Sequence, residues 1–237
     1  MHRDLNVVHV DPSAKIPDSV SLGPGVSIGK NVEIGADTNI AAYAVIKDNT
    51  IIGKNNQIHS FVVLGSSPQK TGDDGSAGQL EIGDDNIFHE FSTVSTGSIN
   101  GKTWIGNRCR FMHHAHVGHD CLVQDQVTLV NHATLAGHVN VGECATIGAF
   151  SAIHQFCNIG AYVFMSRACI VTQDVLPFLL MTHNPAQVRG LNKVGLTRNG
   201  FSKEDISVLQ QAYRCVFREH NSQAELKIKL KFLQESC

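Results

Sequence analysis

Residues 129–153 of the chain read LVNHATLAGHVNVGECATIGAFSAI. An apolar residue returns at every sixth position of this stretch, at Leu129, Leu135, Val141, Ile147 and Ile153. The same phase extends over 105–171 and recurs over 10–64 and 82–94, which makes 25 apolar positions without a failure. With 42% hydrophobic residues, chance would give roughly ten or eleven.

A six-residue period fits neither an α-helix nor an isolated amphipathic strand. It predicts a coil with three flat sides of six residues, so that about eight coils of ~18 residues stack into a mainly β, parallel β-helix. Gly follows the apolar residue at 11 of the 25 positions, and we expect these glycines to turn tight corners with positive φ. The fourth residue after each apolar position is usually small. Four cysteines occupy this slot, and we expect them to be buried packing residues: Cys109, Cys121, Cys157 and Cys169.

The repeat defines the domains. We expect the β-helix to span 1–176, with polar excursion loops at 66–80 and 95–104 where the pattern is lost. A linker is predicted over 177–200, followed by a C-terminal helical domain over 201–237. Ser202 can cap a first helix in that domain, and a second is predicted from about Ser222 to Leu233.

Composition excludes several classes of function. The net charge of −2 over 237 residues argues against nucleic-acid binding. The sequence has no apolar run of the ~18 residues that a membrane span needs, and Met1–Asn6 does not resemble a signal peptide. We therefore expect a cytoplasmic protein without stable membrane insertion. Residues 1–188 carry a net charge of −6 and residues 189–237 a net charge of +4, and such a basic end suits a phosphate group or an acidic partner.

The chain holds thirteen histidines, and seven of them fall on three neighbouring predicted coils: His113, His114, His116, His119, His132, His138 and His154. A metal site, a ladder of hydrogen-bonded imidazoles and acid–base catalysis all remain open. For catalysis, neutral His119 can remove a proton, and Asp120 could orient its imidazole, although adjacent strand residues normally point to opposite faces. Gly137 stacks one coil above His119, where its N–H could stabilise an oxyanion. Such a base and donor are the minimum for direct acyl transfer.

Four motifs carry a family resemblance: HVGHDC at 116–121, NHATLAGHV at 131–139, IHQFC at 153–157 and GLNKVGLTRNGFS at 190–202. With these motifs the chain resembles the UDP-N-acetylglucosamine 3-O-acyltransferases of lipid A biosynthesis along nearly its whole length. The resemblance implies a left-handed β-helix and a homotrimer with active sites between subunits. It also implies an acyl carrier protein thioester as donor, a UDP-sugar as acceptor, and catalysis without a metal or redox cofactor.

The resemblance also implies roles for particular residues. His119 corresponds to the catalytic base, Asp120 to its helper and the Gly137 amide to the oxyanion donor. Other positions correspond to residues that hold sugar, nucleotide or phosphate: Gln69, His116, His138, His154, Gln155, Asn192 and Arg198.

The chain departs from the family pattern at three places. Lys70-Thr71-Gly72 stands where the family usually has Asp-Leu-Lys, and Val94–Ser98 replaces Ile-His-Arg-Gly-Thr. Ser166-Arg167 replaces two glycines near the end of the acyl channel, so we expect that channel to be shortened or redirected.

These changes leave open an N-acyltransferase that uses a nucleotide-linked amino sugar and a short acyl donor, carried by coenzyme A or by acyl carrier protein. Two hypotheses from other classes also remain open. One is a scaffold that no longer catalyses, and the other is a carbonic-anhydrase-like β-helix that holds zinc through histidines across a subunit interface.

Overall fold

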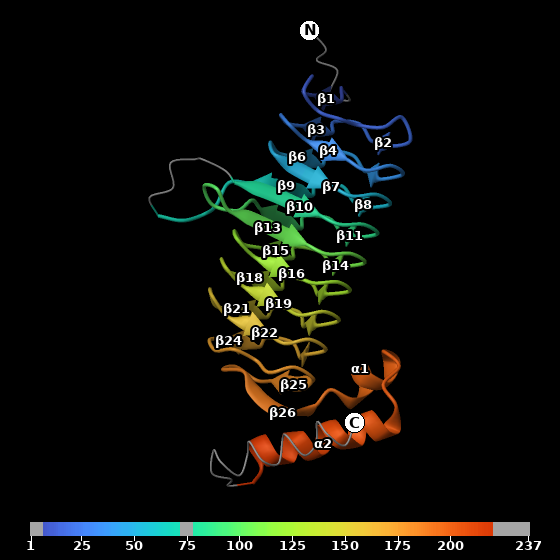
Figure 1. Cartoon of the computed structure of the whole chain (residues 1–237). Helices are drawn as coiled ribbons and strands as arrows, with labels where there is room; N and C mark the ends of the chain where they lie inside the picture. The colour runs from blue at the N-terminus through green and yellow to red at the C-terminus, as the bar shows by residue number, and fades with distance from the viewer. Residues whose placement is uncertain (1–6, 72–77, 220–237) are drawn as a thin grey trace.

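A computed structural model describes residues 7–71 and 78–219 of the chain. Its main body is a triangular prism of stacked coils, with the N-terminal end at one tip and two helices at the other (Figure 1). Each side of the prism is a sheet of very short strands that pair in parallel, except for the last pair of one sheet, and the strands of the coils visit the three sides in turn. The fold is therefore the parallel β-helix that the six-residue period predicts.

The three sheets are named here A, B and C. Sheet A contains nine strands: β1 (His9–Val10), β3 (Ser27–Ile28), β6 (Val45–Ile46), β9 (Val63–Ser66), β12 (Thr93–Ser95), β15 (His116–Val117), β18 (Thr134–Leu135), β21 (Ala152–Ile153) and β24 (Ile170–Val171). Sheet B contains seven strands: β4 (Glu33–Ile34), β7 (Thr50–Ile52), β10 (Gln79–Ile82), β13 (Lys102–Ile105), β16 (Leu122–Val123), β19 (Asn140–Val141) and β22 (Asn158–Ile159). Sheet C contains ten strands: β2 (Ser21–Leu22), β5 (Asn39–Ile40), β8 (Gln57–Ile58), β11 (Ile87–Phe88), β14 (Arg110–Phe111), β17 (Thr128–Leu129), β20 (Thr146–Ile147), β23 (Phe164–Met165), β25 (Leu179–Thr182) and β26 (Gln187–Leu191).

The register follows the 18-residue coil. His116 pairs with Thr134, for example. Of the 25 predicted inward positions, the 22 from Ile28 onward are all buried, whereas Val10 at the open end of the prism is 43% exposed. The small fourth position is buried as well, and Cys109, Cys121, Cys157 and Cys169 fill it as expected.

The predicted reason for the repeated glycines is wrong. Among the 11 glycines that follow an inward residue, Gly65 alone has positive φ. The left-handed corner residues lie two positions further along and are mostly not glycine, such as Asp120 with φ of 58°. The glycines are needed because successive coils approach closely: a Cβ on Gly118 would lie 2.8 Å from the carbonyl carbon of Ala136.

Both excursions are present and slightly shorter than predicted, because strands continue into their ends. The first leaves the prism after β9 and returns at β10, where Leu80 pairs with Thr50, 30 residues back. The second lies between β12 and β13, where Gln79 pairs with Lys102, 23 residues on. Backbone hydrogen bonds such as Gly78 N–H to Gly97 O (2.8 Å) join the two loops.

The segment 177–200 is more ordered than the predicted linker. It contains β25, which continues sheet C, β26, which pairs antiparallel with it, and the short helix α1 (Lys193–Arg198). Helix α2 (Lys203–Phe217) begins with the expected capping box between Ser202 and Asp205. Neither helix is long and apolar enough to cross a bilayer, within the residues described. The predicted second C-terminal helix lies outside the described residues.

Candidate active site

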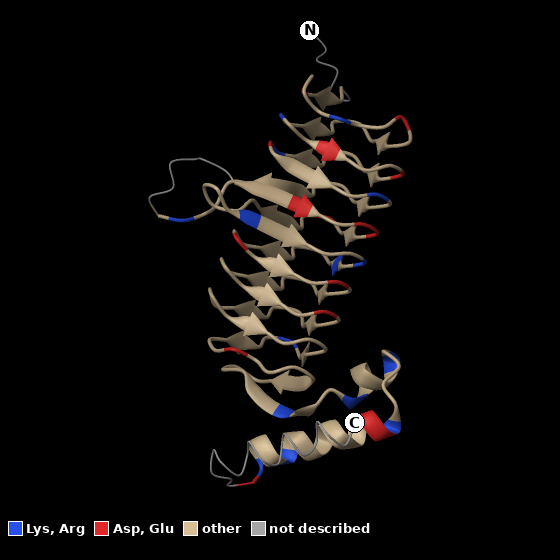
Figure 2. Cartoon of the chain, viewed as in Figure 1, with Lys and Arg blue, Asp and Glu red and all other residues tan. Residues whose placement is uncertain are grey.

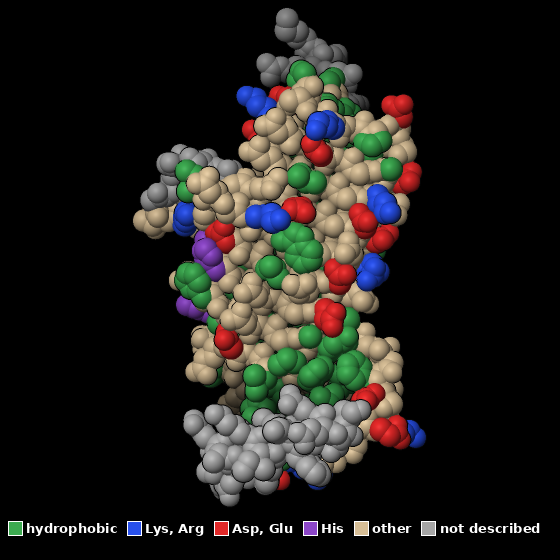
Figure 3. Space-filling model, viewed as in Figure 1, with side chains coloured by type: hydrophobic (Ala, Val, Ile, Leu, Met, Phe, Trp, Pro, Cys, Tyr) green, Lys and Arg blue, Asp and Glu red, His purple; other side chains and the backbone are tan. Residues whose placement is uncertain are grey.

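The candidate site lies where the chain passes from sheet A to sheet B, at the edge of the prism called here the A/B corner. His119, Asp120, Gly137 and His138 all occupy this corner, on two successive coils. Both excursion loops also leave the prism here, because each connects a strand of sheet A to one of sheet B. Histidine side chains show at this edge of the molecule, below the excursions (Figure 3).

His119 and Asp120 form a close pair. The Nδ1 atom of His119 lies 2.7 Å from Oδ2 of Asp120, and their side chains are only 13% and 12% exposed. Neighbours in a strand would point to opposite faces, but this pair sits in the turn after β15 and Asp120 has left-handed backbone geometry. The corner therefore turns both side chains to the same side.

Ser98 is a third member of this hydrogen-bonded group, and sequence reasoning did not identify it. Its Oγ donates to Oδ2 of Asp120 at 2.5 Å, and its backbone N–H donates to Oδ1 at 2.9 Å. Ser98 lies in the second excursion, so the loop holds the carboxylate from the adjacent coil. Burial acts to raise the pKa of Asp120, but the hydrogen bonds from Ser98 and His119 and the charge of His138 leave that pKa below its usual value. Asp120 is thus an ionised acceptor of the hydrogen bonds from Ser98 and His119.

Gly137 lies against the imidazole of His119. A Cβ built on Gly137 would come within 2.5 Å of Cε1 and 2.6 Å of Nε2 of His119. The missing side chain therefore makes room for the ring, which adds to the expected role of the amide. Within the described residues the Gly137 N–H donates no hydrogen bond, so it is available to a ligand.

The corner holds four further predicted substrate residues. The Nε2 atom of His138 lies 3.6 Å from Oδ2 of Asp120, and its ring meets that of His119 edge-on at 5.1 Å. His116 shares a 2.8 Å hydrogen bond between its Nδ1 and the Thr93 hydroxyl, and burial lowers its pKa, so it is neutral near pH 7. Both His154 and Gln155 are exposed on the next coil.

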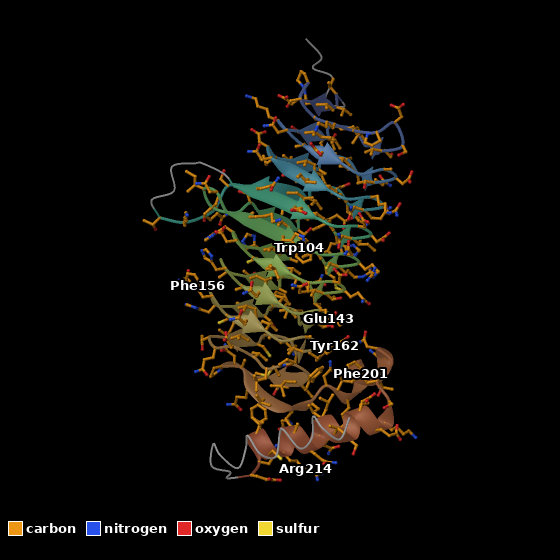
Figure 4. The ribbon with its side chains drawn as sticks, in the orientation of Figure 1. Trp104, Glu143, Phe156, Tyr162, Phe201 and Arg214 are labelled. Carbon is orange, nitrogen blue, oxygen red and sulfur yellow. The ribbon has the colours of Figure 1, made fainter. Side chains whose placement is uncertain are left out.

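Phe156 supports His138 from that coil, and sequence reasoning missed this contact. The two rings stack with their centroids 4.7 Å apart, and Phe156 is 61% exposed. Figure 4 shows Phe156 at the edge of the prism, pointing outward. Its 18-residue spacing from His138 was the signal that could have identified the pair.

The histidines of this region divide into two groups. His114 and His132 lie at the corner between sheets C and A, at the opposite edge of sheet A from the A/B corner. Their ring centroids are 4.6 Å apart, and the stacked column continues through Phe91 and Phe150. This is a ladder, as one interpretation predicted, but its members are stacked rather than hydrogen-bonded.

The A/B corner also offers a possible metal site. His119, Asp120 and His138 have ligand atoms within 4.8 Å of one another, a spacing that zinc could bridge. Asp120 Oδ2 already faces Ser98 and His119 at hydrogen-bond distance, and this arrangement suits a positioned base better than a metal ligand.

Comparison with known proteins identifies the family. Residues 174–236 match the family described as UDP N-acetylglucosamine O-acyltransferase, domain 2, and residues 13–48 and 31–66 match the bacterial transferase hexapeptide repeat. The acyl-[acyl-carrier-protein]–UDP-N-acetylglucosamine O-acyltransferase of Thiobacillus denitrificans is 43% identical over 223 residues, which cover 93% of this chain and 86% of that protein. The chain belongs to the UDP-N-acetylglucosamine O-acyltransferase family.

Solved structures of the UDP-N-acetylglucosamine O-acyltransferase family share the whole architecture. The enzyme from Moraxella catarrhalis RH4 has a TM-score of 0.93 and 38% identity, covering 97% of this chain and 90% of its own. The acyltransferase from Francisella novicida has a TM-score of 0.93 and 35% identity, covering 100% and 87%. The β-helix and the helices that follow it are therefore the family fold.

Two substrate residues inferred from the family resemblance are not brought to the A/B corner within one chain. Asn192 caps α1, where its Oδ1 accepts from Gly195 N–H and its Nδ2 donates to the Tyr162 carbonyl at 2.9 Å. Tyr162 lies at the corner between sheets B and C, on the opposite side of the view from Phe156 (Figure 4). Arg198 is exposed in the last turn of α1. Within one chain, Asn192 therefore lies toward a different edge of the prism from His119.

The remaining predicted residues lie near the surface. Gln69 is exposed in the first excursion, next to Lys70. Ser166 is partly buried and its Oγ lies 3.5 Å from Sγ of Cys169, whereas Arg167 is exposed at the following position. The side chain of Arg167 therefore stands on the outside of the prism, where a neighbouring surface could meet it.

Proposed function

We propose that this protein transfers an acyl group from the thioester of an acyl carrier protein to the 3-hydroxyl of UDP-N-acetylglucosamine. This would be the first step of lipid A biosynthesis, and it would take place in the cytoplasm. The names of the curated relatives support the donor and the acceptor. The observation that carries the mechanism is the hydrogen-bonded series Ser98–Asp120–His119, which ends at an imidazole packed on Gly137.

The geometry gives each group a step. Because the Nδ1 of His119 faces Asp120, Nε2 is the nitrogen left to accept a proton from the acceptor hydroxyl. The oxygen then attacks the thioester carbonyl, and the Gly137 N–H stabilises the charge that develops on the carbonyl oxygen. When the C–S bond breaks, the imidazolium returns its proton to the departing sulfur. Asp120 does not touch substrate and acts as a positioning residue.

Residues at the A/B corner and residues of a second subunit would together bind the substrate. His116, His138, His154 and Gln155 are placed to contact the sugar and its diphosphate at the A/B corner. Gln69 can reach the same region from the excursion loop. Asn192 and Arg198 would act from a second subunit, which supports a homotrimer with a site at each subunit boundary.

The basic end of the chain supports an acidic donor protein. Lys and Arg residues are spread over β26, α1 and α2 (Figure 2). Arg189, Lys193 and Arg198 are all exposed there. An acidic acyl carrier protein would be attracted to this surface, and that attraction should weaken with salt.

The amino-sugar acceptor remains the second candidate, because one observation connects the altered excursion to the catalytic groups. Lys70, which stands where the family usually has Asp, donates to the Oγ of Ser98 at 2.9 Å. Ser98 in turn binds Asp120. The change in the loop therefore reaches the positioning series, and it could accompany a change of acceptor.

An acyl-transfer assay that measures thiol release tests the proposal. Acyl carrier protein and coenzyme A donors of several chain lengths are crossed with UDP-N-acetylglucosamine and nucleotide-linked amino sugars. Activity with a 3-hydroxyacyl carrier protein and UDP-N-acetylglucosamine is expected. Activity only with an amino sugar would establish the alternative, and the absence of transfer with every pair would favour a scaffold.

Two variants connect the activity to residues. His119→Ala should abolish transfer while the oligomeric state and Tm stay near those of the wild type, and near-native turnover would reject His119 as the base. Arg167→Gly should admit longer acyl donors if Arg167 narrows the acyl channel. An unchanged donor preference would place Arg167 outside that channel.

A further inference from the structure

A second group of histidines lies at the corner between sheets C and A, away from the catalytic corner. His59 follows β8, His89 and Glu90 follow β11, and His113 follows β14. We call these four residues the C/A cluster. They come from three successive coils, and the proposed acyl transfer uses none of them.

Glu90 is at the centre of the C/A cluster. Its Oε1 lies 3.4 Å from Nδ1 of His59, and its Oε2 lies 3.0 Å from Nε2 of His113. The His89 ring packs between the other two imidazoles, with centroids 4.8 Å from His59 and 5.4 Å from His113. One ligand atom from each of His59, His89 and Glu90 lies within 4.8 Å of the others.

The donor atoms of the C/A cluster suit a transition-metal ion. Two imidazoles and one carboxylate are a common ligand set for zinc and similar divalent ions. Arg110 opposes a cation here, and the charge of Glu90 offsets it.

We propose that His59, His89 and Glu90 bind one divalent transition-metal ion, with zinc as the natural occupant. Bonds of about 2.0–2.2 Å in a tetrahedron require ligand atoms to be roughly 3.4 Å apart. The side chains of His59 and Glu90 are 41% and 33% exposed, so they can make this small contraction. His113 holds the other carboxylate oxygen and fixes its orientation. Water would fill the fourth position.

The place of the cluster in the fold suggests what the metal does. From His59 to His89 the chain makes a coil of 30 residues, and the next coil, which ends at Met112, has 23. These are the coils that carry the two excursion loops. Longer loops cost more entropy to close, and a metal that joins His59 to His89 links the two ends of the 30-residue coil and offsets that cost. Its role is thus to stabilise the part of the prism from which the loops with Gln69 and Ser98 project.

The test is a zinc titration of the metal-stripped full-length protein. Wild type should bind about one zinc per chain, and its Tm should rise as zinc is added. His89→Ala and the isosteric Glu90→Gln should lose at least tenfold in zinc affinity and most of the Tm rise. His183→Ala removes an exposed histidine outside the cluster, and it should behave as the wild type.

Two measurements separate the possible failures. His138→Ala should keep the zinc, because zinc lost only in this variant would belong to the catalytic corner and would overturn the proposal. A wild type without zinc-dependent stabilisation, or a His89→Ala variant that binds as tightly as wild type, would overturn it as well. Circular dichroism checks that each variant is folded. Acyl transfer by folded His89→Ala, measured well below its Tm, should stay near that of wild type, which makes the zinc result independent of the proposed enzymatic function.

Discussion

Gly137→Ala tests most directly whether the imidazole of His119, the proposed base, must lie where the structure places it. The added methyl group would meet Cε1 of His119 at 2.5 Å and Nε2 at 2.6 Å. Ordinary contacts begin near 3.4 Å, so the ring has to move by about 0.9 Å. Gly137 is not among the glycines with positive φ, so alanine brings no backbone strain. The substitution therefore acts on the ring and leaves the fold in place.

The expected effect follows from this displacement. A misplacement of about 1 Å in a positioned group can cost roughly 10²-fold in rate, which corresponds to about 2.7 kcal/mol in the activation free energy. His119 Nδ1 is held by Asp120 at 2.7 Å, so the ring cannot move away from the methyl group without weakening that hydrogen bond. We therefore expect kcat to fall by about two orders of magnitude, with KM for the acceptor changing much less.

The assay is steady-state acyl transfer, with Tm measured on the same preparations. Gly190→Ala is the matched control, because a Cβ there meets nothing within 4 Å, and both its kcat and its Tm should stay near wild type. Gly118→Ala should instead lose stability, since its Cβ would press on the backbone of the next coil. If Gly137→Ala retained kcat within about threefold, the imidazole would not be acting from the observed position, and the assignment of His119 as base would fail.

Three further predictions concern other parts of the chain. The pKa of Asp120 is lower in the folded state than in the unfolded state. Its contribution to stability is therefore complete above the ordinary Asp pKa near 3.8, and it is lost as the pH falls through the lower folded value. In urea unfolding measured at a series of pH values, Asp120→Asn should remove this loss of stability at acid pH. Burial raises the pKa of both Cys109 and Cys121 to about 12, so mass spectrometry of native protein treated with iodoacetamide at pH 8 should show neither alkylated. Phe88 is fully buried, and Phe88→Ala should destabilise the fold by about 3–5 kcal/mol in chemical unfolding, while its folded fraction keeps the acyl-transfer kcat.

The sequence predicts the prism well because one local rule is repeated many times. Each coil has to place an apolar side chain inward at fixed intervals, and a single mistake in phase would expose the whole following face. The same repeat does not reveal why glycine recurs. Periodicity shows where glycine recurs, but a tight corner and a close approach between coils both favour the residue, and only the three-dimensional packing distinguishes them. Gly118 illustrates the second cause, since it has ordinary φ and a crowded Cβ position.

The candidate site is predictable to the extent that it follows the 18-residue register. His119 and Gly137 are 18 apart, so their stacking follows from the period of the sequence alone. Ser98 could not be found in this way, because it lies in an excursion whose length breaks the register. It reaches Asp120 across 22 residues through a loop geometry that no period specifies. The prediction of a linker over 177–200 missed ordered structure for a related reason, because β25 continues sheet C without the six-residue pattern.

This division between register and loops also separates the segments that could set the choice of substrate from the corner that is proposed to do the chemistry. His119, the proposed base, and Asp120 sit on a corner with the same left-handed geometry as the other corners of the prism, so the repeat alone secures the close approach of His119 to Gly137. The carboxylate of Asp120, which is proposed to position His119, is held from outside the repeat by Ser98, and Lys70 of the other loop donates a hydrogen bond to Ser98. Substitutions in these loops can therefore alter which acceptor is bound and how strongly the base is oriented, while the stacked coils remain intact. The unusual residues of this chain lie in those loops and at Ser166-Arg167, and selectivity for acceptor and donor should be sought there rather than in the core.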